Sequence, residues 1–352
     1  MSYSAHLMRK EFSNPDLNLH PLPSLGLAGQ DGTLSIGDDG VKQETTIIDW
    51  NSDNHIVRRE IERVANLVLI HWDSASVIVR QEVVDGMTYE FHYIPTLANK
   101  IGIRKHGDTS SECFLCDDAS PEAFQIENPV NRALKVNNYP FMDNSVLTSE
   151  LDHSQTLSEE HLQASVKIAN RYGLNLAYSG ANSGASSPDH AHIHLFTTHI
   201  PLYDMEPSWI FSSDTLQQGY LPDYPAGVLV LESERPDILA KQAIYLMRRL
   251  GKLVVNFNLQ YSFSNNRLFI FPRKSTTAEA LGGIELGATS VSGVFQPDAR
   301  GYTGSDIAEA LEIIDARFKN INGETMKKAI EEMVTSKEFL FKCIMPLLES
   351  TI

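Results

Sequence analysis

Three histidines, His190, His192 and His194, occupy alternate positions in the stretch SSPDHAHIHLFTTH (residues 186–199). Side chains two residues apart in a β-strand lie on the same face of the sheet. The spacing therefore predicts a strand with three imidazoles on one face, while the apolar residues between them enter a core. A neutral imidazole is a competent nucleophile near neutral pH, because no base has to remove a proton from it first.

A loop of small residues leads into this predicted strand. Gly184, Ser186 and Ser187 have little side-chain bulk, so their backbone N–H groups can approach a phosphate closely. Nucleophilic chemistry on a phosphate is one interpretation of the loop and strand together. Two others stay open: a solvated polar face of an amphipathic strand, and a catalytic zinc ion held by the three histidines themselves.

The segment HAHIHLF resembles the alternating histidine signature of the histidine-triad superfamily of nucleotide hydrolases and transferases. In that superfamily the middle histidine attacks the α-phosphate of a nucleotide and forms a nucleotidyl-histidine. The resemblance implies that His192 is the nucleophile and that His194 and the loop residue Ser186 assist it. Members of the superfamily are often dimeric, and a homodimer is compatible with this resemblance.

A second group of residues has metal-binding chemistry. Cys113 and Cys116 have the two-residue spacing of a zinc knuckle, although such a pair alone leaves zinc, redox work and coincidence open. With His153 and His190 they resemble, in order and in local context, the ligand set of the galactose-1-phosphate uridylyltransferase branch of the superfamily. The resemblance implies a structural zinc ion, because four protein ligands leave no open position for catalysis.

Two stretches near the histidine strand resemble substrate-binding segments of the same branch. LKVNNYPF resembles the segment that contacts the nucleoside, which puts Asn137 and Asn138 near the ribose and base; the alternative is an ordinary turn. GASSPDHAH is similar to the pattern Gly-x-Ser-Asn-Pro-His-Pro-His, with one residue more between the serine and the first histidine. This extra residue leaves open whether Ser186 or Ser187 faces the α-phosphate.

The C-terminal half contains a further resemblance. YSFSNNRLFIFPRK and AEALGGIELGATSVSGVF resemble the second half of GDP-hexose phosphorylases and, more loosely, that of diadenosine tetraphosphate phosphorylases. Arg273 and Lys274 end the first of these segments, so they are candidates to bind the leaving or the incoming phosphate. The alternative is that both are solvated charges at the end of a strand.

The elements that position these residues follow an α+β pattern. TLSEEHLQASVKIANRYG (residues 156–173) predicts a helix, with Thr156 and Glu159 as a capping box and Gly173 just past its C-terminal end. A strand, the small-residue loop and the histidine strand follow. Upstream, two predicted strands form a hairpin that turns at residues 85–86.

After residue 205 the order of a strand, a helix and a hairpin occurs again, although no strong sequence repeat accompanies it. We therefore expect two histidine-triad-like halves, each an antiparallel sheet with packed helices. The expected division is an N-terminal extension over residues 1–85, a catalytic half with the zinc site over 86–205, and a second half over 206–352.

The overall composition limits the classes of function. The chain has 352 residues and a formal net charge of −16, which argues against a non-specific binder of nucleic acid or anionic membranes, since such proteins need clustered Lys and Arg. The sequence has no apolar run long enough for a membrane span and no apolar secretory segment near its start. Three cysteines are few, so we expect a reducing compartment and a cytoplasmic protein.

Together, these features predict a nucleotidyltransferase that forms a covalent nucleotidyl-histidine. Its expected substrate is a nucleoside diphosphate sugar or a dinucleoside polyphosphate, with phosphate or a sugar 1-phosphate as acceptor. A histidine-triad nucleotide hydrolase is the alternative, because the transferase branch usually has glutamine where this chain has His194. The chain also differs from the bacterial uridylyltransferases, whose second half holds a histidine cluster, because no histidine follows His199. A zinc-stabilised nucleotide-binding scaffold without activity is the third interpretation.

Overall fold

The computed structural model describes most of the chain from residue 77 onward. Two residues with predicted roles, Asn138 and Ser186, lie outside the described residues, and so does most of the predicted N-terminal extension. The division of the chain at residues 85 and 205 stays a proposal. The described residues are 48–49, 77–94, 97–98, 113, 115–116, 124–127, 132–137, 142, 145–150, 153–185, 187–254, 256–299, 302, 304 and 306–343.

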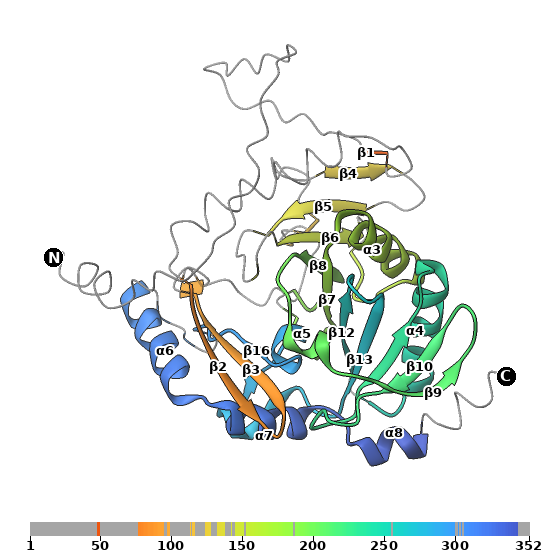
Figure 1. Ribbon diagram of the computed structural model, residues 1–352. Helices are drawn as coiled ribbons and strands as arrows, with labels where there is room; N and C mark the ends of the chain where they lie inside the picture. The colour runs from red at the N-terminus through yellow and green to blue at the C-terminus, as the bar shows by residue number, and fades with distance from the viewer. Residues whose placement is uncertain are drawn as a thin grey trace, which may run out of the picture. The chain divides into compact units, whose positions relative to one another are not determined.

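Eleven of the described strands form one sheet, in the order β1-β4-β5-β6-β8-β7-β12-β13-β11-β10-β9 (Figure 1). The strands of its first half are β1 (Ile48–Asp49), β4 (Phe124–Glu127), β5 (Arg132–Val136), β6 (Val146–Glu150), β7 (Asn175–Ser179) and β8 (His192–Phe196). The strands of its second half are β9 (Ser208–Ser212), β10 (Gln217–Tyr220), β11 (Leu229–Glu232), β12 (Asn256–Ser262) and β13 (Arg267–Arg273).

The two halves of this sheet have the same strand pairing. In each half, three successive antiparallel strands are followed by a helix and a hairpin, and the third strand pairs with the last strand of the hairpin. The inner strands β7 and β12 pair antiparallel and join the halves. The duplicated α+β fold expected from the sequence is confirmed, and His192 and Arg267 hold the equivalent first positions of β8 and β13.

Two helices, α3 (Glu159–Tyr172) and α4 (Pro236–Leu250), pack against each other and share a hydrophobic core with the sheet (Figure 1). Ala191, Ile193 and Leu195 are buried in this core, as the alternation with the histidines predicts. The regular strand starts two residues later than the histidine pattern suggests, so the first histidine of the pattern precedes β8.

The N-terminal cap of α3 differs from the prediction. Ser158, rather than Thr156, caps the helix, and its Oγ accepts a hydrogen bond from the backbone N–H of His161 at 3.0 Å. Glu159 is therefore the first helical residue and not the third, where a capping box needs its glutamate. The other end is as predicted, since Gly173 adopts the left-handed conformation with a φ of 68°.

A second sheet has the strand order β16-β3-β2 and consists of β2 (Ile78–Val84), β3 (Met87–Tyr93) and β16 (Val294–Phe295). β2 and β3 form the predicted hairpin. Asp85 and Gly86 make its turn with φ values of 50° and 82°, which is the backbone that a two-residue turn of this kind requires.

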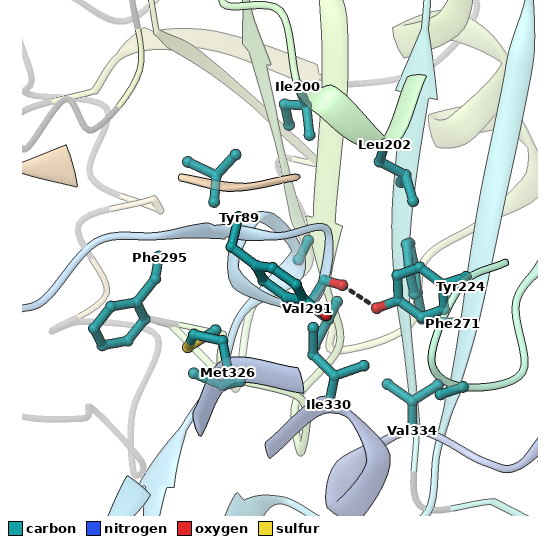
Figure 2. Close-up of a cluster of buried hydrophobic side chains, with 14 of the residues drawn as sticks. Tyr89, Ile200, Leu202, Tyr224, Phe271, Val291, Phe295, Met326, Ile330 and Val334 are labelled. Atoms are coloured by element: carbon teal, nitrogen blue, oxygen red, sulfur yellow. Dashed lines mark hydrogen bonds between the residues drawn. The ribbon is translucent and has the colours of Figure 1, made fainter. Parts of the chain in front are cut away.

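The second sheet contributes to a core on the opposite face of the main sheet. Phe196 of β8 and Phe271 of β13 each follow a residue of the first core, so their side chains lie on the other face of the main sheet. Both belong to this second core, together with Tyr89 of β3. Figure 2 shows the Tyr224 hydroxyl, which donates a hydrogen bond to the carbonyl of Val291 inside this core. The polar face of β8 therefore lies on the same side of the main sheet as the second core.

The remaining elements contribute residues to these two cores or to a smaller third cluster. They are η3 (Pro201–Asp204), β14 (Thr277–Ala278), η4 (Glu279–Leu281), β15 (Ile284–Glu285), α5 (Ala288–Val291), α6 (Ile307–Asn320), α7 (Gly323–Met333) and α8 (Lys337–Cys343). Every helix within the described ranges is too short or too polar to span a bilayer.

Candidate active site and metal centre

The four residues predicted to bind zinc meet in the structure. One ligand atom from each of Cys113, Cys116, His153 and His190 lies within 4.8 Å of all the others. The Sγ atom of Cys116 is 3.0 Å from Nδ1 of His153 and 3.3 Å from Nδ1 of His190. A sulfur and a nitrogen ligand of one tetrahedral zinc ion stand roughly 3.6 Å apart, so the cluster fits this ion in donor type and in spacing.

Hydrogen bonds hold His190 in the orientation that a metal ligand needs. Its Nε2–H donates to the carbonyl of Glu150 at 2.7 Å, and its Nδ1 faces the sulfur atoms of the two cysteines. The backbone N–H of the next residue, Ala191, donates to the carbonyl of Ser154 at 2.6 Å. Such contacts at the second ring nitrogen fix the tautomer and the ring orientation of a metal-binding histidine.

His192 has the tautomer and the charge of a nucleophile. It is 3% exposed, and its Nδ1 lies 2.9 Å from the carbonyl oxygen of His190, so Nδ1–H donates to this oxygen and Nε2 keeps its lone pair. Burial lowers the pKa of His192, and the ring is therefore neutral at pH 7. In this tautomer the lone pair is on Nε2, the ring atom that can act as a nucleophile toward phosphorus.

The three histidines of the pattern divide between two groups. The ring of His190 contacts that of His153, with centroids 5.2 Å apart. The rings of His192 and His194 contact each other, also with centroids 5.2 Å apart and nearly perpendicular at 72°. His194 is partly exposed, whereas His192 is buried, so the two have different access to a water molecule or an acceptor.

Close backbone contacts fix the loop between β7 and β8. Gly184 has a φ of +83°, and a Cβ atom at this position would lie 2.5 Å from the carbonyl oxygen of Leu286. Only glycine fits both the backbone conformation and the space. The hydroxyl of Ser183 donates to the carbonyl of Phe257 at 2.9 Å, which ties the loop to the start of β12.

Two other predicted substrate-binding residues are buried beside these elements. Asn137 donates from Nδ2 to the Oγ of Ser145 at 3.0 Å, so its amide is held by a local turn. The carbonyl of Ser187 accepts a hydrogen bond from the backbone N–H of His190 at 3.4 Å. The structure thus places Ser187 directly against a residue of the histidine pattern.

Arg273 and Lys274 end β13 in very different surroundings. Arg273 is fully buried and donates from Nη1 to Oδ1 of Asn258 and to the carbonyl of Leu286, the latter at 2.9 Å. Burial lowers the pKa of Arg273 to about 10. Because Nη1 and Nη2 of Arg273 donate to protein acceptors next to the loop, the geometry favours a positioning role for this residue. Lys274 is exposed, so its ammonium group is accessible to an anion.

Two residues that contact the site were not predicted from the sequence. Asn258 donates from Nδ2 to the carbonyl of Ser183 at 2.8 Å, and Asp189 lies against His153, with Oδ2 3.3 Å from Nε2. A signal for Asn258 exists in the segment NFNLQYS, where polar and apolar residues alternate in a buried strand. This alternation marks a polar face inside the protein, and such a face needs partners.

Comparison with known proteins connects the first half to one family. Residues 71–197 match a family described as a domain of unknown function (DUF4922), which spans less than half of the chain. The matched region includes the histidine pattern and all four candidate metal ligands. No curated protein matches the sequence.

Solved structures share the fold over most of the chain. Yeast Ap4A phosphorylase in complex with Ap4A is 13% identical, with a TM-score of 0.54, over 80% of this chain and 98% of that chain. The same enzyme in complex with AMP is 13% identical, with a TM-score of 0.51, over 77% of this chain and 96% of that chain. The chain has the histidine-triad fold. This fold is present in the duplicated form expected from the sequence. A shared fold does not determine the reaction, so the reaction has to be inferred from the residues of the site.

Proposed function

We propose that this protein is a nucleotidyltransferase of the phosphorylase type, which acts through a covalent nucleotidyl-His192. The observation that supports this proposal most directly is the state of His192, whose Nδ1–H is bound to the carbonyl of His190 and whose buried ring is neutral at pH 7. The fold shared with an Ap4A phosphorylase supports dinucleoside polyphosphates or nucleoside diphosphate sugars as the substrate class.

In the first half-reaction, Nε2 of His192 bonds to the α-phosphorus as the bond from this phosphorus to the bridging oxygen breaks. The bonding pair stays on that oxygen, and the distal group departs as a phosphate-terminated product. Backbone N–H groups of the loop around Gly184 and Ser187 bind the non-bridging oxygens. The positive charge that develops on the ring is stabilised through Nδ1–H by the carbonyl of His190.

In the second half-reaction, an oxygen of phosphate or of a sugar 1-phosphate attacks the same phosphorus. The N–P bond of the nucleotidyl-histidine breaks, and the electron pair returns to Nε2 of His192. Lys274, exposed at the end of β13, contacts the incoming or leaving phosphate, and Asn137 and Asn138 lie near the nucleoside in this proposal. His194 and Ser186 assist at the phosphate.

The four residues Cys113, Cys116, His153 and His190 hold a zinc ion in this proposal. Bound there, zinc would supply a structural cross-link and no open coordination position. His190 then has two duties, since its ring is a ligand while its backbone carbonyl orients the nucleophile. The metal centre thereby connects the fold of the cysteine segment to the position of His192.

A substrate panel tests the proposed function. Nucleoside diphosphate sugars and dinucleoside polyphosphates are each incubated with the protein, with and without inorganic phosphate, and the nucleotide products are quantified. We expect release of a nucleoside diphosphate that depends on phosphate. Turnover that is equal without phosphate and yields a nucleoside monophosphate would reject the phosphorylase and support the hydrolase.

The hydrolase remains the second candidate because of one residue, His194, which stands where the transferase branch usually has glutamine. The variant His194→Gln separates the two functions. A transferase should keep phosphate-dependent turnover, since glutamine retains a hydrogen-bond donor and acceptor at this position. A hydrolase that needs His194 for proton transfer should lose about a hundredfold or more in rate.

A further inference from the structure

Asp189 is the residue that makes the loop before the histidine strand one residue longer than the pattern it resembles. With the proline of SSPDHAH aligned to the proline of the pattern, Asp189 is the extra residue before His190. It is 9% exposed, and neither of its carboxylate oxygens receives a hydrogen bond from the described residues. A buried carboxylate in such surroundings is costly unless a donor or a cation compensates it.

The ring of a candidate zinc ligand lies next to this carboxylate. Nε2 of His153 lies 3.3 Å from Oδ2 of Asp189, while Nδ1 of the same ring lies 3.0 Å from Sγ of Cys116. The imidazole therefore stands between a thiol and a carboxylate. When Nδ1 of a neutral histidine binds a metal, Nε2 carries the proton and can donate it in a hydrogen bond to a neighbouring acceptor, here the Asp189 carboxylate.

We propose that Asp189 is the carboxylate partner of the zinc ligand His153 and that this pair sets the affinity and rigidity of the metal centre. The proposal rests on the structural zinc of the proposed function. Two thiolates balance the charge of the ion, so the carboxylate adds a negative charge just outside the ligand shell. Such a charge makes the imidazole a stronger ligand and holds its ring in place.

The place of Asp189 in the chain links the metal centre to the nucleophile. Asp189 directly precedes His190. Its contact with His153 therefore anchors the end of the loop between β7 and β8 independently of the His190 ring. Asp189 is thus a positioning residue, which acts on the reaction through its contact with His153 and through its place directly before His190.

Competition for zinc with a chromophoric chelator, without any nucleotide, tests the proposal. Asp189→Asn keeps the shape of the side chain and removes the charge, and it should weaken zinc binding by about 10- to 100-fold. Asp204→Asn is the matched control, because Asp204 also contacts a histidine, with Oδ2 2.9 Å from Nε2 of His199, but on an exposed site. Its zinc affinity should equal that of the wild type.

A second pair of variants distinguishes this role from a general effect on the fold. In His153→Cys, zinc keeps four ligands but loses the ring that Asp189 contacts, so adding Asp189→Asn should no longer weaken binding. An equal loss in both backgrounds, or wild-type affinity in Asp189→Asn alone, would overturn the proposal. Asp189→Ser replaces Asp189→Asn in both backgrounds if the latter does not fold.

The zinc measurement separates this inference from the proposed reaction. A wild-type protein that binds no zinc overturns the inference and the metal part of the proposed function together. Zinc binding that depends on Asp189 supports the inference even if no nucleotidyl adduct forms on His192. A zinc affinity that is the same with and without the Asp189 carboxylate overturns the inference, but it does not contradict the proposed reaction.

Discussion

The two halves of the main sheet share their strand pairing but differ in their final hairpins. In the first half, residues 180–191 connect β7 to β8, which starts at His192; in the second, residues 263–266 turn tightly into β13, which starts at Arg267. Arg267 donates from Nε to Glu232 across the strand pair at 2.7 Å. The same strand arrangement thus supports a long loop that leads to the proposed nucleophile in one half and a short turn that leads to an ion pair in the other.

The second half contributes support for the loop of the first. Within the described residues, the only cluster of potential metal ligands lies in the first half. Arg273 and Asn258, both buried in the second half, form a chain of hydrogen bonds that ends at the carbonyl of Ser183 in the loop. One copy of the duplicated unit thus holds the candidate catalytic and metal-binding residues, while the other contributes hydrogen bonds that hold their loop in place.

Substitution at the first position of β8 should have the largest effect in this comparison. His192→Ala removes the nucleophile, so phosphate-dependent nucleotide release should fall by at least about a thousandfold. Arg267→Met changes the equivalent position of β13 and should cost about 1 kcal/mol of stability through its ion pair, with little effect on turnover. Steady-state kinetics of both folded variants test this. Similar losses of turnover in both variants would mean that the first residue of β8, like that of β13, has only a structural role.

Removal of a metal ligand should have the next largest effect. Cys113→Ser deletes one of four ligands, so bound zinc should be lost and the free energy of unfolding should fall by about 3 kcal/mol or more. Cys343→Ser is the matched variant in the second half, because Cys343 is only partly buried at the end of α8. Elemental analysis and thermal unfolding report on both. Retained zinc with unchanged stability in Cys113→Ser would contradict the metal site.

A smaller difference is expected between two glycines with similar backbones. Gly184 and Gly282 have φ values of +83° and +67°, but only Gly184 faces a neighbour, Leu286, within contact distance of a new Cβ atom. Gly282→Ala should cost about 1 kcal/mol from backbone strain alone. Gly184→Ala adds a clash with backbone and should cost about 3 kcal/mol, with a loss of turnover because the loop moves. Equal unfolding free energies for the two variants would show that the loop is not packed as described.

The sequence predicts the fold and the metal cluster well where the signals are local or modular. Alternation placed Ala191, Ile193 and Leu195 in the core. The resemblance of the cysteine pair and two histidines to a known ligand set identified a cluster that the structure brings together. The cap of α3 was misplaced by two residues, because serine and threonine both fit an N-cap and only the start of the helix decides between them.

Long-range contacts account for what the sequence did not predict. The sequence offered Arg273 as a candidate phosphate ligand but did not predict its burial. This burial involves contacts with Asn258 of β12 and with Leu286, which its neighbours in sequence do not reveal. The contact between Asp189 and His153 joins residues far apart in the chain. Pairings of this kind follow from the register of a duplicated sheet, which hydrophobic patterns alone do not specify.

The mass of the intact protein tests the central claim most directly. The wild type is incubated with a dinucleoside polyphosphate or nucleoside diphosphate sugar without acceptor, quenched in neutral denaturant to preserve a phosphoramidate, and analysed whole and after digestion. Our account predicts the added mass of one nucleotidyl group on His192, which disappears when phosphate is supplied before the quench. A substrate that turns over with no adduct, or with an adduct on another residue, would contradict it.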